Sequence, residues 1–202
     1  LALDSSYFGF VDLDYCLQIR IIVTNTPYFP TEAIAEHTLG LMLGVAKRII
    51  VSDRQTQKGQ YVLVEGKELK NKTLGIIGLG HIGTRVVELG LAIGMKVIAW
   101  NRTPKEIKGV RLEPLERVLS VSDFVSINLA ENSETENFIS KDRIAFLKKG
   151  VIVINLAGRS LVDEMAMAEA LKARKVDSYA LEAENIIGPL VGVENALLFK
   201  GF

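Results

Sequence analysis

The residues best suited to chemistry form a glycine-rich segment, Gly78-Leu79-Gly80-His81-Ile82-Gly83, with the spacing GxGxxG. The segment joins an apolar run, TLGII, to a helical pattern, which is the context that a dinucleotide-binding turn requires. The first glycine permits a tight turn, the second lets the backbone approach a pyrophosphate, and the third allows close helix–strand packing. The amides at the helix N-terminus then face the negative charge. We predict cofactor contacts at Gly78, Gly80, His81, Ile82 and Gly83; the alternative, a glycine-rich turn without a ligand, is disfavoured by this context.

A second segment whose side chains could bind a ligand is Asn101-Arg102-Thr103. It follows the next expected strand, where dinucleotide-binding folds often place an acidic residue. A carboxylate there would accept hydrogen bonds from a ribose 2′-hydroxyl and repel a 2′-phosphate. Neutral Asn101 removes that repulsion, and Arg102 and Thr103 can donate to a phosphate. We therefore expect NADP to be preferred over NAD. The alternative is an ordinary solvated arginine at the end of a strand.

The composition excludes several other classes of protein. The 202 residues are 49% hydrophobic and 24% charged, with 24 basic and 24 acidic side chains, so a dedicated nucleic-acid binder is not expected. With one cysteine, Cys16, and two histidines, neither a disulfide nor a metal site is expected. No apolar run reaches membrane-spanning length, and no signal peptide is recognisable behind Leu1. We expect a cytoplasmic protein, and the missing start methionine indicates a trimmed or partial chain.

The positions of these segments follow from an alternation of expected strands and helices beyond residue 72. Continuous apolar strands such as VIVIN indicate a parallel sheet covered on both faces, so the fold class is α/β, a doubly wound Rossmann sheet over residues 31–202. An earlier helix over 32–50 should begin behind Thr31 as N-cap, and Ile21–Val23 form a β-branched run. The expected strands are Thr73–Gly78, Lys96–Trp100, Phe124–Leu129, Val151–Asn155 and Ser178–Ala183, and the expected helices Ile82–Ile93, Leu115–Ser120, Lys141–Leu147 and Asp163–Arg174.

Several motifs in fixed order resemble the D-isomer-specific 2-hydroxyacid dehydrogenases. They are VDLD at residues 11–14, IVTNTP at 22–27, TEAIAEHTL at 31–39, GIIGLGHIG at 75–83, SETEN at 133–137, and the segment 151–163. The resemblance implies a nucleotide domain, with residues 1–30 as a remnant and connector of a second, substrate domain. It implies hydride transfer between a nicotinamide and a small 2-hydroxy or 2-keto acid, and a homodimer formed through the helix that carries His37. Further cofactor contacts are expected at Leu129, Ala130, Leu156, Ala157 and Glu182.

The catalytic residues of the family are where this sequence departs from the resemblance. The family uses an arginine for the substrate carboxylate and a histidine–glutamate pair for acid/base chemistry. The matching positions here are Gly158, Gly201 and Ile187, respectively, and the family's substrate-binding glycine loop is replaced around Ser6-Tyr7-Phe8. Arg159, one position from the expected arginine, is the main remaining catalytic candidate, and Lys200, near the position of the lost histidine, is the alternative proton donor.

Three interpretations follow. The first is an NAD(P)-dependent oxidoreductase of this family with an atypical catalytic set. The second is a degenerate cofactor-binding module with a regulatory or interaction role. The third is an isolated nucleotide domain of a larger enzyme.

Overall fold

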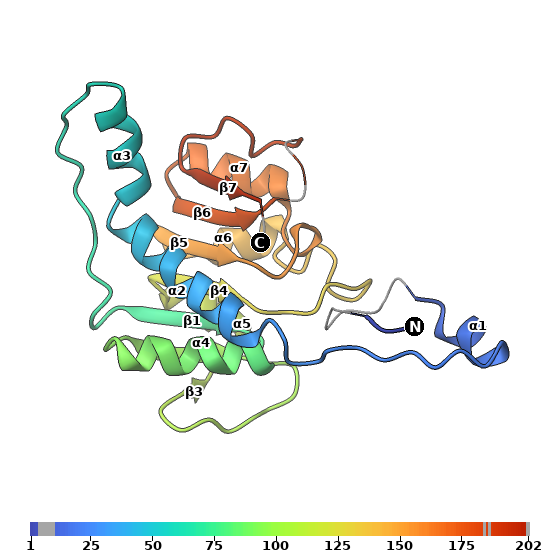
Figure 1. Ribbon diagram of the computed structural model, residues 1–202. Helices are drawn as coiled ribbons and strands as arrows, with labels where there is room; N and C mark the ends of the chain where they lie inside the picture. The colour runs from blue at the N-terminus through green and yellow to red at the C-terminus, as the bar shows by residue number, and fades with distance from the viewer. Residues whose placement is uncertain (4–10, 184, 186, 201–202) are drawn as a thin grey trace.

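The computed structural model describes residues 1–3, 11–183, 185 and 187–200, and within them a seven-stranded, wholly parallel sheet is central (Figure 1). The spatial order is β3-β2-β1-β4-β5-β6-β7. This order, in which the chain reverses direction across the sheet between β1 and β4, is that of a doubly wound Rossmann domain and confirms the predicted fold class. The strands are β1 (Thr73–Ile77), β2 (Lys96–Trp100), β3 (Arg111–Leu112), β4 (Phe124–Ile127), β5 (Val151–Asn155), β6 (Val176–Glu182) and β7 (Ala196–Phe199).

Two hydrophobic cores, one on each face, hold the sheet between layers of helices. On one face α2 (Thr31–Ala46) and α4 (His81–Ala92) cover buried side chains such as Leu74 and Ile76. On the other face α5 (Leu115–Val121), α6 (Lys141–Phe146) and α7 (Glu164–Lys172) cover Ile77 and Val125. Neighbouring residues of one strand thus enter opposite cores, and all five residues of β5 are buried. This double coverage explains why the strands read as continuous apolar runs.

The sequence predictions for the β-strands hold to within two residues at each end, with two omissions. β6 begins at Val176, two residues before the expected Ser178. The short edge strands β3 and β7 were not expected from their sequences. The β-branched run Ile21–Val23 lies outside the strands of the sheet, and within the described residues the neighbouring Thr24 forms an isolated parallel bridge with Ala2.

The helix expected over residues 32–50 is instead two helices, α2 and α3 (Ile49–Gln57). Arg48 breaks the helix with a left-handed backbone, φ 57°. The N-cap assignment of Thr31 was also wrong: Pro30 occupies the cap position without a side-chain hydrogen bond, and Thr31 is the first helical residue.

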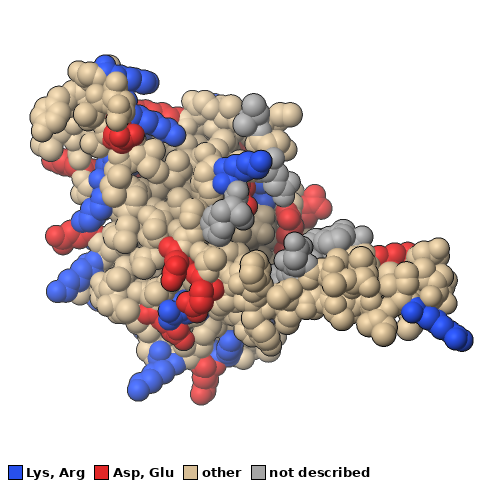
Figure 2. All heavy atoms as spheres, in the orientation of Figure 1, with Lys and Arg blue, Asp and Glu red and all other residues tan. Residues whose placement is uncertain are grey.

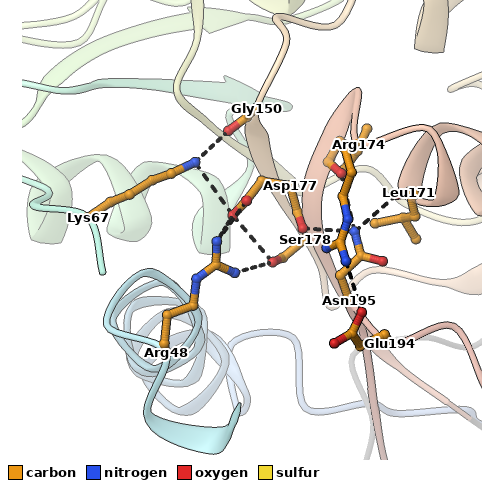
Figure 3. Close-up of polar contacts among 10 residues, drawn as sticks. Arg48, Lys67, Gly150, Leu171, Arg174, Asp177, Ser178, Glu194 and Asn195 are labelled. Carbon is orange, nitrogen blue, oxygen red and sulfur yellow. Dashed lines mark hydrogen bonds and ion pairs between the residues drawn. The ribbon is translucent and has the colours of Figure 1, made fainter. Parts of the chain in front are cut away.

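A polar network fixes the break between α2 and α3 to the sheet (Figure 3). The Arg48 guanidinium donates to both carboxylate oxygens of Asp177, at 2.8 and 3.0 Å, beside the start of β6. Lys67 Nζ lies 3.5 Å from the same carboxylate and donates to the Gly150 carbonyl at 3.0 Å. The ion pair between Arg48 and Asp177 is largely buried, with side chains 20% and 18% exposed. It therefore offsets part of the strain of the left-handed residue.

The N-terminal segment projects away from the sheet (Figure 1) and carries α1 (Leu13–Gln18), which Asp12 caps by accepting from the Tyr15 amide at 2.8 Å. Its surface is mostly uncharged in Figure 2, and large apolar side chains lie exposed along it. These are Leu13, Tyr15, Leu17, Ile19, Ile21, Ile22, Tyr28 and Phe29. None of the helices in the described residues is long and apolar enough to cross a membrane.

Candidate functional site

A cleft of about 470 Å³ opens at the carboxyl ends of the central strands, where the strand order reverses. Open α/β sheets bind their ligands at this point, because the connections from the two neighbouring strands leave in opposite directions. The cleft is lined from the glycine turn after β1, from the segments after β4 and β5, and from the connector before α2. The lining residues are Pro27, Pro30, Thr31, Ile34, Gly80, His81, Ile82, Gly83, Ile127, Asn128, Leu129, Ala130, Glu131, Leu156 and Ala157.

The three glycines of the turn meet different steric demands. Gly78 has φ 95°, and a Cβ on it would lie 2.4 Å from the Asn128 carbonyl oxygen. A Cβ on Gly83 would lie 2.0 Å from the Gly78 carbonyl oxygen, so the start of α4 packs directly on the turn. A Cβ on Gly80 would meet nothing within 4 Å. The absent side chain of Gly80 therefore keeps open space beside the N-terminus of α4, where backbone amides favour an anion. This cradle fits the pyrophosphate of a dinucleotide.

The end of β2 is tied to the turn by Asn101. Its Oδ1 accepts from the Leu79 amide at 2.8 Å, and its Nδ2 donates to the Thr103 carbonyl at 2.6 Å. Arg102 pairs with Glu134 at 2.7 Å, but both side chains are more than 70% exposed. Such a pair contributes little to stability, so the guanidinium is available to a stronger anion.

Lys105 is a residue of this region that sequence analysis missed. Its Nζ donates to the Leu79 carbonyl and to the Thr84 hydroxyl, both at 3.1 Å, which brings a positive charge onto the glycine turn. Four residues beyond Asn101, it had no motif to mark it. The signal that could have indicated it was that Lys105 adds a third hydrogen-bond donor, after Arg102 and Thr103, to the same short loop.

The remaining predicted cofactor residues divide into two groups. Leu129, Ala130, Leu156 and Ala157 all line the cleft with the turn. Glu182 does not: it ends β6, half-buried, in register with Phe199 of β7. It lies near His37 of α2, whose ring contacts that of Phe199 at 5.0 Å. Burial lowers the pKa of His37, and the charge of Glu182 opposes that shift.

The structure describes two of the three positions that the resemblance matches to the family's catalytic residues. Gly158 begins the turn after β5, and Ile187 is 74% exposed, while Gly201 lies outside the described residues. Ser6-Tyr7-Phe8 also lies outside them. Among the described residues, no group of His, Cys, Asp and Glu is placed to hold a metal ion.

Arg159, the main remaining catalytic candidate, is not among the residues lining the cleft. Its Nε and Nη2 donate to the two carboxylate oxygens of Glu164, at 2.8 and 2.7 Å. Nη1 donates to Asn185 Oδ1 at 2.7 Å, and Nη2 also donates to the Ile187 carbonyl at 2.8 Å. These contacts tie α7 to the segment after β6.

Sequence analysis also missed the connector and the acidic lining of the cleft. Tyr28 in the connector packs edge-on against His81, with ring centroids 4.5 Å apart. Asn128 and Glu131, after β4, line the cleft with Leu129 and Ala130. Their signal was positional: residues just beyond the strand next to β1 lie at the switch point of a doubly wound sheet.

The sheet order, the glycine turn and the cleft at the switch point define a Rossmann-type dinucleotide-binding domain. Residues 39–198 match the family model described as D-isomer specific 2-hydroxyacid dehydrogenase, NAD binding domain. The chain belongs to this family, as its motifs predicted.

Individual relatives show the same likeness. The chain is 35% identical to a glyoxylate reductase of Aeropyrum pernix over 95% of its own length and 62% of that protein. A structure of D-lactate dehydrogenase from Aquifex aeolicus with NAD and lactic acid matches with a TM-score of 0.85 and 30% identity, covering 98% of this chain and 68% of that one. An acyclic imino acid reductase in complex with NADPH and D-Arg matches with a TM-score of 0.90 and 27% identity, over 98% and 66%. The chain thus spans less than two thirds of the curated reductase.

Proposed function

We propose that this chain supplies the cofactor-binding half of an NAD(P)-dependent oxidoreductase of the D-2-hydroxyacid dehydrogenase type. The observation that carries the proposal is the open space at Gly80 beside the N-terminus of α4, at the switch point of the sheet. Gly80, His81 and Ile82 would hold the pyrophosphate through backbone amides. Leu129, Ala130, Leu156 and Ala157 would border the rest of the cofactor. A bound nicotinamide dinucleotide would donate a hydride to C2 of a small 2-keto acid in its reduced form, or accept one from C2 of a 2-hydroxy acid in its oxidised form.

We further propose that NADP is preferred to NAD. Arg102, Thr103 and Lys105 lie in one loop beyond β2, and Lys105 already contacts the glycine turn. No carboxylate in the segment from 101 to 105 would repel a 2′-phosphate. The three donors can surround that phosphate with charge-assisted hydrogen bonds.

The catalytic set is the part of the proposal that departs from the family. With Gly158, Ile187 and Gly201 at the matching positions, proton transfer needs groups other than the family's histidine and glutamate. Arg159 keeps its place as a proposed catalytic residue only if it can exchange its contacts with Glu164 for a substrate. The second candidate function is a cofactor-binding regulatory or interaction module. It is favoured because the catalytic positions are replaced while the glycine turn is intact.

The organisation beyond this domain is also a proposal. The exposed apolar side chains of residues 11–30 support the assignment of residues 1–30 to a second, substrate domain that would cover them. We also propose a homodimer through α2 and the arm after α3 (residues 58–65). Exposed apolar side chains beside α2 support it: Ile49 at the start of α3, and Tyr61 and Leu63 in the arm, are 57%, 98% and 91% exposed. A cytoplasmic location stays a prediction.

The test of cofactor binding uses two matched glycine variants. Gly80→Ala adds a methyl group that meets no protein atom within 4 Å, at an ordinary φ of −69°. We expect it to leave the melting temperature unchanged and to weaken binding of both NADPH and NADH at least tenfold, or about 1.4 kcal/mol. Gly40→Ala, on α2, also meets nothing within 4 Å and is the control that should bind normally. Equal binding by wild type and Gly80→Ala would contradict the proposed cradle.

A turnover measurement then distinguishes the two candidate functions, the dehydrogenase and the regulatory module. The full-length protein, loaded with NADPH, is mixed with a panel of 2-keto acids while absorbance of the reduced cofactor is followed. Oxidation of NADPH supports the dehydrogenase. Tight cofactor binding with no oxidation across the panel supports the module.

A further inference from the structure

Glu131 carries a formal charge in the cleft. Among the described residues that line it, no other side chain is ionisable except the imidazole of His81. The other lining residues are apolar or neutral. A carboxylate in a partly enclosed, largely apolar cleft has lost part of its hydration, so a cation entering the cleft would be bound strongly.

The Glu131 carboxylate lies against Gly158, the position where the family has its substrate-binding arginine. A Cβ built on Gly158 would lie 2.6 Å from Glu131 Cδ and 2.7 and 2.8 Å from its two oxygens. Any side chain at 158, an arginine included, would therefore displace Glu131. Glycine at 158 thus leaves room for the Glu131 carboxylate, so this part of the cleft carries an anion beside the position where the family has a cation.

Within the part of the chain that the structure describes, no cationic side chain pairs with Glu131. Its Oε1 accepts from the Ser160 amide at 3.1 Å, which orients the carboxylate. Among the described residues, no other hydrogen bond to Glu131 and no ion pair within 4 Å is found. Arg159, which lies in the chain between Gly158 and Ser160, forms its ion pair with Glu164 instead. Among the same residues, no donor to Oε2 is found.

We propose that Glu131 binds a cationic nitrogen of the substrate, so that the preferred acid carries an ammonium group besides its 2-hydroxy or 2-keto function. This inference rests on the proposed function, because it places the substrate beside the dinucleotide in the same cleft. The ammonium group would donate to Oε2 of Glu131, and the carboxylate of the substrate would need donors other than residue 158.

The experiment compares three three-carbon 2-hydroxy acids that differ only at the terminal carbon. Isoserine carries an ammonium group there, glycerate a hydroxyl, and lactate a hydrogen. They are titrated calorimetrically into the full-length protein loaded with NADPH, which cannot oxidise a hydroxy acid, so binding is measured without turnover. We expect isoserine to bind at least about tenfold more tightly than glycerate or lactate, the effect of one charge-assisted hydrogen bond.

Two variants assign that preference to Glu131. Glu131→Gln keeps an acceptor for the Ser160 amide and removes the charge; the three acids should then bind within about threefold of one another, a difference below one hydrogen bond. Glu136→Gln, the same change at an exposed position that does not line the cleft, should keep the wild-type preference. Lactate binding as tightly as isoserine in the wild type, or an isoserine preference that survives Glu131→Gln, would overturn the proposal. The wild-type comparison decides even if the variant does not fold.

A second cation to be distinguished is the nicotinamide ring of the oxidised cofactor. We expect Glu131→Gln to change the affinities for NADP⁺ and NADPH by the same factor. If Glu131→Gln weakened the binding of NADP⁺ but not that of NADPH, Glu131 would be assigned to the cofactor, and its role in substrate binding would be overturned. Failure of the unmodified protein to bind either cofactor would instead refute the proposed function itself.

Discussion

Asn101 Oδ1 accepts the Leu79 amide at 2.8 Å, so the residue that ends β2 also holds the backbone of the glycine turn. The same side chain donates to the Thr103 carbonyl and thereby shapes the loop that carries Arg102 and Lys105. A side chain at this position therefore affects both the turn and the charge near the cofactor's ribose. The two effects can be separated by substitution.

Asn101→Asp is expected to discriminate between the two cofactors. Aspartate can still accept from the Leu79 amide, although it loses the donor to the Thr103 carbonyl. Its negative charge would repel a 2′-phosphate, and its carboxylate could accept from a 2′-hydroxyl. We expect the Kd for NADPH to rise about tenfold or more, or roughly 1.4 kcal/mol, while the Kd for NADH stays constant or falls. Quenching of protein fluorescence measures both. Equal loss of affinity for NADPH and NADH would show that Asn101 acts on the glycine turn alone.

Lys105→Met tests the positive charge on the turn. The substitution keeps most of the aliphatic stem and removes the ammonium group that contacts Leu79 and Thr84. NADPH binding should weaken about fivefold to tenfold and lose part of its salt dependence, with little change for NADH. Lys108→Met, an exposed lysine of the same loop, is the matched control. Equal effects at both positions would indicate only a general loss of positive charge.

Arg159→Ala is expected to act first on stability. The Arg159–Glu164 pair is mostly buried, with side chains 20% and 15% exposed, and the substitution leaves Glu164 without its partner. We expect the free energy of unfolding in urea to fall by about 2 kcal/mol, somewhat less than for a fully buried pair. Arg174→Ala breaks the Arg174–Glu194 pair, 62% and 77% exposed, and should cost less than about 0.5 kcal/mol. Unchanged stability combined with lost turnover would favour the catalytic role of Arg159.

His37 should make folding sensitive to mild acid. Because burial lowers its pKa, the unfolded chain takes up a proton near the ordinary value of 6.5 while the folded protein resists it until lower pH. The unfolded state then binds more protons in that window, so the free energy of unfolding should fall as pH drops from about 7 to about 5. His37→Gln should flatten this slope. Parallel pH profiles for wild type and variant would show that His37 does not contribute.

The exposed arm after α3 is expected to mediate self-association. The double substitution Tyr61→Ser with Leu63→Ser removes two almost fully exposed apolar side chains. We expect a homodimer of the wild type and a shift towards monomer in the variant, measured by size-exclusion chromatography with light scattering. Met165→Ser is the control, because it removes an apolar side chain of α7 that is 63% exposed. It should leave the molar mass measured by light scattering at the wild-type value. A monomeric wild type would refute the proposed dimer.

The sequence predicted the elements whose pattern is local. The glycine turn was recognisable because an apolar strand, three glycines and a helix follow one another within residues 73–92. The central strands were recognisable because burial on both faces leaves continuous apolar runs. The glycine turn located four residues that line the cleft, Gly80, His81, Ile82 and Gly83, and the family resemblance located Leu129, Ala130, Leu156 and Ala157.

What escaped prediction depends on partners distant in sequence. The break between α2 and α3 falls at Arg48, with neither glycine nor proline, and the Asp177 carboxylate that holds it lies 129 residues away. β7 is half-buried and is defined by its pairing with β6. The relationship of Glu131 to Gly158 exists only because the ends of β4 and β5 are neighbours.

The position of β1 in the sheet has a consequence for synthesis of the chain. Its two partners are β2, at residues 96–100, and β4, at residues 124–127, both later in the sequence. While the ribosome is still translating the region before β4, one edge of this apolar strand has no neighbour to pair with. The nascent chain therefore exposes an unpaired edge of β1 over that interval, and a chaperone that binds extended apolar segments should contact β1 until residue 127 has emerged and then release it.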